Sequence, residues 1–171
     1  MDLVKLVRHY TINHRPRSRD ELEWFRNQSS LEDTIKLAAL ARDACGKRLR
    51  HQRRITKQNL EKARVILLSA VNDLKRCKTF DELLNLVESD LHGIRGLGEL
   101  YAYDTALRIG AKLGLLPENV YLHAGTRKGA KVLRLDWKAR ALEVSAVPNE
   151  LQELQPREIE DFLCIAFTKI G

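Results

Sequence analysis

The sequence contains little that interrupts helices and no segment that could cross a membrane. Among its 171 residues are only four prolines, and most of the nine glycines lie between Gly93 and Gly129. No apolar run approaches the roughly 20 residues that a membrane-spanning helix requires. The three cysteines are odd in number and widely spaced, which excludes a disulfide framework and favours a reducing compartment.

The composition is that of a folded protein. Hydrophobic residues make up 44% and charged residues 31%, which excludes a disordered chain, and the length suits a single domain. The first residues lack the apolar core and the small-residue cleavage site of a signal peptide. We therefore expect one compact domain over residues 1–171 in the cytoplasm, without a membrane partner.

Positive charge is concentrated in the first part of the chain. Residues 1–78 contain 19 Lys and Arg against 9 Asp and Glu, a net charge of +10, whereas residues 79–171 contain 11 against 14, a net charge of −3. A basic half suits a polyanionic partner, because each neutralised phosphate releases counterions. On charge alone, a basic domain with no nucleic-acid role fits equally well.

Apolar spacing and capping residues predict an all-α protein. The expected helices run from Leu31 to near Gly46, from about Thr56 to Arg76, onward from Thr79, and onward from Pro156. Strand patterns are sparse: only 120–122 and 142–147 are expected to form short extended pieces.

The turn expected between the first two helices is strongly basic. Residues 47–64 contain eight Lys and Arg and one acid, so Arg50, Arg53 and Arg54 are candidates for phosphate contacts. Lys47 and Arg48 are expected to face solvent with them. A merely solvated turn is the alternative.

The most informative segment joins two apolar helices and reads Ile94-Arg95-Gly96-Leu97-Gly98-Glu99-Leu100-Tyr101-Ala102. It resembles the helix-hairpin-helix motif of DNA-binding proteins, which has Gly-apolar-Gly and a small residue four positions later. The glycines suit a positive φ or a close approach of another chain, and the amides that open the second helix suit a phosphate. The candidate contacts are Arg95, Gly96, Leu97 and Gly98; a plain turn between helices is the alternative.

The resemblance extends to DNA glycosylases of the endonuclease III type over about residues 80–135. In that family the hairpin is followed by a Val-Asp-x-His segment and a helix that meets DNA; here the segment is Val120-Tyr121-Leu122-His123. We expect Thr126 to cap a helix that begins at Arg127, and a second phosphate contact from Thr126, Arg127, Lys128 and Lys131. The chain also resembles a bacterial protein family without an assigned activity.

Two departures from the glycosylase pattern bear on catalysis. Leu100 stands where bifunctional members carry a Schiff-base lysine, and Tyr121 stands where the family carries its aspartate. Neither side chain can form the imine or supply the negative charge. Weak candidates for a replacement carboxylate are Asp104, Glu99 and Glu118. The histidines and cysteines lack zinc-ligand spacing and no nucleotide-binding motif occurs, so we expect no metal and no cofactor.

The sequence therefore predicts an all-α, bundle-like domain with a basic helical half, 1–78, and a helix-hairpin-helix half, 79–171. We expect a DNA-binding protein that contacts the sugar-phosphate backbone of duplex, damaged or branched DNA with little sequence specificity, and not an enzyme. The alternatives are a lesion-processing enzyme of DNA repair, similar to a glycosylase but with a non-standard carboxylate, and a protein-interaction module. The sequence does not indicate an oligomeric state.

Overall fold

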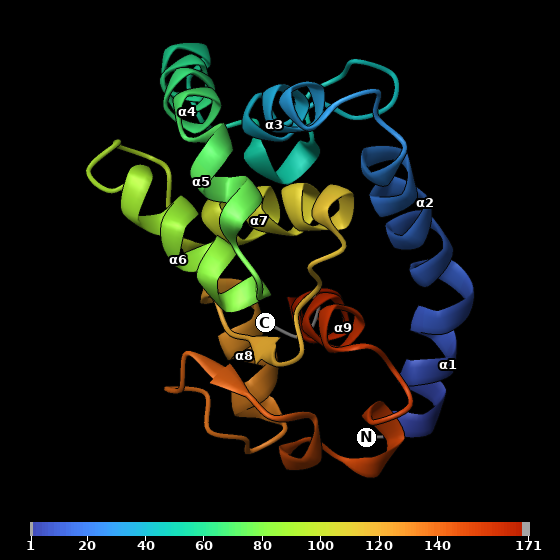
Figure 1. The fold of residues 1–171 in the computed structure, drawn as a ribbon. Helices are drawn as coiled ribbons and strands as arrows, with labels where there is room; N and C mark the ends of the chain where they lie inside the picture. The colour runs from blue at the N-terminus through green and yellow to red at the C-terminus, as the bar shows by residue number, and fades with distance from the viewer. Residues whose placement is uncertain (1, 169–171) are drawn as a thin grey trace. The chain divides into compact units, whose positions relative to one another are not determined.

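The computed structural model describes residues 2–168 (Figure 1). With 64% helix and 4% strand, the all-α prediction is confirmed. The helices are α1 (Leu3–Asn13), α2 (Arg15–Arg26), α3 (Leu31–Ala39), α4 (Lys57–Ser69), α5 (Val71–Arg76), α6 (Phe80–Asp90), α7 (Glu99–Leu113), α8 (Ala124–Val132) and α9 (Pro156–Thr168). Three short 3₁₀ turns are η1 (Arg50–Gln52), η2 (Val144–Ala146) and η3 (Asn149–Leu151), and the strands are β1 (Val120–Tyr121) and β2 (Ala141–Leu142).

Hydroxyl side chains cap the starts of three helices. The hydroxyls of Ser30, Thr56 and Thr79 each accept a hydrogen bond from the amide three residues later, which opens α3, α4 and α6. Each bond satisfies one of the amides that a helix N-terminus leaves without a carbonyl partner. The predicted starts at Leu31, after Thr79 and at Pro156 are confirmed.

Two predicted helix lengths are wrong. The first helix ends at Ala39 and not near Gly46, because Ala41 takes a left-handed φ of 51°. The chain then turns about Asp43, whose Oδ1 accepts bonds from the amides of Cys45 and Lys47. The second expected helix is broken at Ala70, where ψ is 7°, into α4 and α5.

The expected extended pieces form one small antiparallel pair. Val120 lies opposite Leu142 and Tyr121 lies opposite Ala141. Beyond Leu142 the prediction of an extended segment is wrong, because residues 144–146 form η2.

Two compact units make up the chain. The central unit is Asp20–Leu116, and the terminal unit combines Met1–Arg19 with Pro117–Gly171. These boundaries differ from the two halves expected from charge, because residues 20–78 share the central unit with the hairpin segment.

In the central unit, α7 lies between α3 and α6 (Figure 1). The core is formed by fully buried side chains that include Ile35, Leu83 and Ile109. The Tyr101 hydroxyl donates to the Ala39 carbonyl at 2.6 Å and joins α7 to the end of α3. Burial raises the pKa of Tyr101 to about 12, so this hydroxyl remains a donor at neutral pH.

In the terminal unit, α8 packs closely on α9. Gly129 permits the contact, because a Cβ at this position would lie 2.4 Å from the carbonyl oxygen of Leu163. At the N-terminal end of the chain, the Tyr10 hydroxyl donates to Asp161 at 3.0 Å and Arg19 Nε donates to Glu158 at 2.7 Å.

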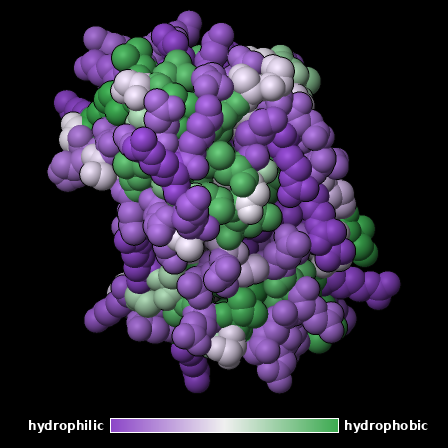
Figure 2. All heavy atoms as spheres, viewed as in Figure 1, coloured by the Kyte–Doolittle hydropathy of each residue, from purple (hydrophilic) through white to green (hydrophobic). Residues whose placement is uncertain are grey.

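One face of the molecule is mainly polar (Figure 2). Figure 2 shows hydrophilic residues over most of the face that it draws, with apolar residues in separate patches. Within the described part of the chain, no helix has the length and apolar character to span a bilayer.

Candidate nucleic-acid interface

The segment between α6 and α7 is a tight turn with open surroundings. Gly93 and Gly96 have φ values of 81° and 87°, a left-handed conformation that L side chains rarely adopt. Gly98 differs, because its φ of −94° and ψ of −175° are extended and permitted to any residue. An added Cβ at any of the three would meet no atom within 4 Å. Gly98 is therefore required neither by the fold nor by internal packing.

The first turn of α7 has no side-chain cap. Gly98 is the N-cap and supplies no hydroxyl or carboxylate, and the first intrahelical bond runs from the Ala102 amide to the Gly98 carbonyl at 3.1 Å. The amides of Leu100 and Tyr101 therefore have no carbonyl partner within the helix. A helix N-terminus in this state favours an anion, because the amides and the helix dipole both present positive charge.

A first link, a side-chain hydrogen bond, joins the basic segment to this turn. Asn59, in the first turn of α4, donates through Nδ2 to the carbonyl of Arg95 at 2.6 Å. The N-terminus of α4 thus lies against the turn that precedes α7.

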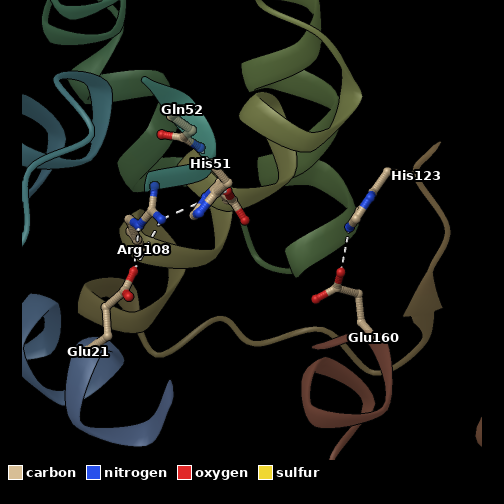
Figure 3. A network of polar contacts seen from close by, with 7 residues as sticks. Glu21, His51, Gln52, Arg108, His123 and Glu160 are labelled. Atoms are coloured by element: carbon tan, nitrogen blue, oxygen red, sulfur yellow. Dashed lines mark hydrogen bonds and ion pairs between the residues drawn. The ribbon is translucent and has the colours of Figure 1, made fainter. Parts of the chain in front are cut away.

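A second link connects η1 with α7 (Figure 3). Asp104 Oδ2 accepts a hydrogen bond from Gln52 Nε2 at 2.7 Å and lies 2.7 Å from Nε2 of His51. The Asp104 side chain retains 15% exposure, and the His51 ring retains 47%. The carboxylate thus holds two consecutive residues of the basic segment.

The second link is supported by a buried arginine. Arg108, only 3% exposed, donates through Nε to Glu21 at 3.1 Å and places Nη2 3.8 Å from Asp104. Its guanidinium also lies 5.6 Å from the ring centroid of Phe25. Two carboxylates near one buried cation compensate its charge, so removal of either leaves an incompletely paired arginine.

The two links join segments of the central unit that were predicted separately. The chain between Gln52 and Asn59 carries Arg53, Arg54 and Lys57, all exposed. It is held at one end to α7 and at the other to the turn that carries Arg95, which is also exposed. The two links join the basic stretch to the glycine turn and α7, although the stretch and the turn are about 40 residues apart in sequence. We call the exposed residues of the two segments the hairpin surface, with members Arg53, Arg54, Lys57, Arg95, Gly96 and Gly98.

The remaining residues predicted to contact phosphate or to face solvent in these two segments differ in their exposure. Leu97 is half-buried, and Lys47 is exposed as expected. Arg48 is half-buried and not exposed, because its Nη1 donates to the carbonyl of Ile55 at 2.7 Å. Arg50 belongs to η1, but its side chain lies outside the part of the structure that is described.

The second predicted phosphate contact belongs to the terminal unit and needs one correction. The helix α8 begins at Ala124 and His123 is its N-cap, so Thr126 does not cap a helix starting at Arg127. Thr126 is fully buried, with Oγ1 2.6 Å from the His123 amide nitrogen, and cannot reach a phosphate. Lys128 and Lys131 are exposed, and Arg127 is half-buried.

The histidine of the glycosylase-like segment is also buried. His123 Nε2 contacts the carboxylate of Glu160, which lies on α9 of the same unit (Figure 3). Tyr121 is buried in β1. The segment 120–123 thus contributes to the core of the terminal unit, whereas the glycine turn lies in the central unit.

The three candidate carboxylates have different surroundings. Asp104 is engaged by its contacts with His51 and Gln52. Glu99 is exposed at the first position of α7, next to the glycine turn. Glu118 is exposed in the connection before β1 and belongs to the other unit. Leu100, at the position of the Schiff-base lysine, is half-buried.

No metal site is evident between residues 2 and 168, where no three His, Cys, Asp or Glu side chains gather closely enough to hold an ion. Within the same residues, Cys45, Cys77 and Cys164 form no disulfide.

Sequence reasoning missed three residues that organise the interface. Asn59, His51 and Gln52 bond to residues 36, 53 and 52 positions away, and no local pattern specifies such pairs. The only signal in the sequence was the polar pair Gln58-Asn59 in the first turn after the helix cap Thr56, and sequence alone assigns such a pair to solvent.

Comparison with known proteins gave no match to a protein-family model, a curated protein or a solved structure.

Proposed function

We propose that this protein binds duplex DNA through its sugar-phosphate backbone, using the hairpin surface and reading little base sequence. The observation that supports this most strongly is the pair of links, Asn59 to Arg95 and Gln52 to Asp104, which join a segment with exposed arginines to α7 and to the turn before its uncapped N-terminus. Phosphate contacts of this kind position a duplex and carry no base information.

The geometry of the turn fits a helix-hairpin-helix motif. A left-handed Gly96, an extended and open Gly98, and a buried Ala102 follow an apolar helix and open another. Because Gly98 needs no positive φ and an added Cβ there would meet no atom within 4 Å, the close approach of a partner is a physical reason for a glycine at this position. A phosphate would meet the α7 amides at this point, with Arg53, Arg54 and Arg95 available for neighbouring phosphates.

Gly98→Asp separates this function from stability. An aspartate N-cap would accept the amides of the first turn and stabilise α7, by a few tenths of a kcal/mol to about 1 kcal/mol. The same carboxylate would occupy the proposed phosphate position and repel the duplex. We expect the variant to melt at the same or a higher temperature while its affinity for a fluorescein-labelled duplex, measured by anisotropy, falls at least about tenfold.

Asn72→Asp is the matched control, because it adds the same charge at an exposed position of α5 in the same unit. We expect it to bind duplex nearly as the wild type does. Equal affinities of folded Gly98→Asp and Asn72→Asp would remove the α7 N-terminus from the interface.

One observation favours a second function, the processing of the bound DNA. His51 is half-exposed and is oriented by a carboxylate, Asp104, which is the arrangement that fixes a histidine for acid–base catalysis. A duplex held at the hairpin surface would lie near this ring.

The second function is tested on duplexes that carry an abasic site. Strand cleavage by the wild type, its loss in His51→Ala and unchanged duplex affinity of that variant would support it. Absence of cleavage by the wild type would reject catalysis and leave the binding function standing.

A further inference from the structure

The terminal unit exposes a tryptophan on the connection between α8 and β2. Trp137 is 37% exposed, although it lies next to residues that enter the core. Leu133, Leu135 and Ala139 pack against that core, and the Trp137 amide donates to the Leu135 carbonyl at 2.8 Å. The connection is thus fixed from inside, and the indole is left partly in solvent.

Two lysines lie over this indole. The Nζ atoms of Lys131 and Lys138 are 5.4 Å and 5.5 Å from the ring centroid, within the range of a cation–π contact. Lys131 lies in the last turn of α8 and Lys138 follows Trp137 directly in the connection after that helix.

The segment that carries the ring is rich in lysine and arginine. Residues 127–140 contain six Lys and Arg and one acid, Asp136. Lys128, Lys131, Arg134 and Lys138 are exposed, and none is within ion-pair distance of a carboxylate from residues 2–168. Asp136 instead accepts a hydrogen bond from the amide of Lys138. Such a patch attracts a polyanion without prior breakage of ion pairs.

We infer that Trp137 is a stacking platform for an unpaired base of single-stranded DNA, with Lys128, Lys131, Arg134 and Lys138 contacting the adjoining phosphates. An exposed aromatic surrounded by cations supplies partners for both features of a single strand, the π face of a base and the charge of the backbone. Paired bases are already stacked on one another inside a duplex, so the indole selects for an unpaired base.

The lysines over the ring do not prevent stacking. A cation–π contact at an exposed site is weaker than base–aromatic stacking, so a base displaces an ammonium group from the indole. The displaced lysine then meets the phosphate that arrives with the base, and its charge remains compensated.

This site uses other residues and another ligand chemistry than the proposed duplex interface. The hairpin surface belongs to the central unit and is tested with duplex, whereas Trp137 belongs to the terminal unit and is tested with single strands. Failure of one proposal leaves the other intact.

The experiment uses the full-length chain with Trp24→Phe, which leaves Trp137 as the only tryptophan of the two. We expect a ten-nucleotide oligothymidylate to quench the Trp137 fluorescence as it binds. Inorganic polyphosphate, which has the charge and no bases, should compete for binding without quenching.

In the otherwise unaltered chain, Trp137→Ala should weaken oligothymidylate binding, measured by anisotropy, by roughly five- to a hundredfold, and Trp137→Phe should retain most of the affinity. The duplex affinity should remain within about twofold in both variants. Because the ring is exposed, both are expected to fold, and circular dichroism checks this.

Three results would overturn the inference: no binding of the oligothymidylate, equal affinity in folded Trp137→Ala, or equal quenching by polyphosphate. The last two would describe a cationic surface that uses charge alone.

Discussion

The half-buried Asp90 and the buried Glu158 differ in whether their carboxylate oxygens accept hydrogen bonds. Asp90 ends α6, and its Oδ2 is buried and has no hydrogen-bond partner within residues 2–168. Burial, and secondarily the negative charge of Asp73, raises the pKa of Asp90. A negative charge in the last turn of a helix is also opposed by the helix dipole. Asp90 therefore destabilises the folded state at neutral pH.

We expect Asp90→Asn to raise the free energy of unfolding at pH 7 by a few tenths of a kcal/mol to about 1 kcal/mol. The pKa of Asp90 is higher in the folded state than in the unfolded state, so the ionised carboxylate lowers the stability of the wild type at neutral pH. This loss of stability disappears when the pH falls below the unfolded pKa and the carboxylate is protonated in both states. Chemical denaturation at pH 7 and pH 4 measures the free energy of unfolding of the wild type and of Asp90→Asn. A variant that is less stable than the wild type at pH 7 would contradict this interpretation of Asp90.

Glu158, unlike Asp90, has hydrogen-bond partners and a lowered pKa. Burial, the largest influence, acts to raise its pKa, but the hydrogen bonds from Arg19 and the Gln155 amide, with the charges of Arg19 and Arg157, together lower the pKa of Glu158. Because the pKa of Glu158 is lower in the folded state, its ionised carboxylate stabilises the fold above the unfolded pKa. This contribution is lost as the pH falls through the folded pKa.

Glu158→Gln should therefore be less stable than the wild type at pH 7, and the difference should shrink between about pH 5 and pH 3. Urea denaturation across this range provides the test. Arg19→Gln is the partner variant, and it should flatten the same pH dependence. A constant difference between wild type and Glu158→Gln would show that this pair does not couple folding to protonation.

At the scale of elements, glycines act in two different ways. Gly129 allows α8 and α9 to touch, because its Cβ would meet the Leu163 carbonyl oxygen at 2.4 Å and Phe167 at 2.9 Å. Gly98 is surrounded by open space. The same substitution at the two positions separates packing from surface effects.

Gly129→Ala should destabilise the protein, because the overlap costs about 1–3 kcal/mol and exceeds the gain in helix propensity of up to about 1 kcal/mol. Gly98→Ala should leave the melting temperature nearly unchanged. Equal melting temperatures for Gly129→Ala and the wild type would mean that α8 and α9 do not pack as described.

The elements also show what sequence could predict. Capping by Ser30 and Thr79 and the proline at α9 are local signals, so those helix starts were predicted correctly. The end of α3 and the position of Thr126 were not, because Ala41 takes a left-handed φ that alanine disfavours and because a histidine, His123, is the N-cap of α8. The glycine turn was found by its pattern, but its links through Asn59 and Gln52 depend on the tertiary fold.

At the scale of the whole molecule, charge is distributed differently from the expected halves. The central unit carries 17 Lys and Arg against 14 Asp and Glu, a net charge of +3, so its net positive charge is small. Its affinity for a polyanion therefore depends on local placement, in which Arg53, Arg54 and Lys57 gather at the hairpin surface. Lys75 and Arg76, which end α5, instead form ion pairs with Glu32 and Asp73.

The most direct test is the salt dependence of duplex binding. We predict a linear fall of log affinity with log salt concentration, and a slope that is shallower by about 0.9 for each phosphate that Arg53→Ala/Arg54→Ala no longer neutralises. Lys75→Ala/Arg76→Ala removes the same charge from the same unit and should keep the wild-type slope. A flat salt dependence of the wild type, or equal slopes for the two double variants, would contradict DNA binding at the hairpin surface.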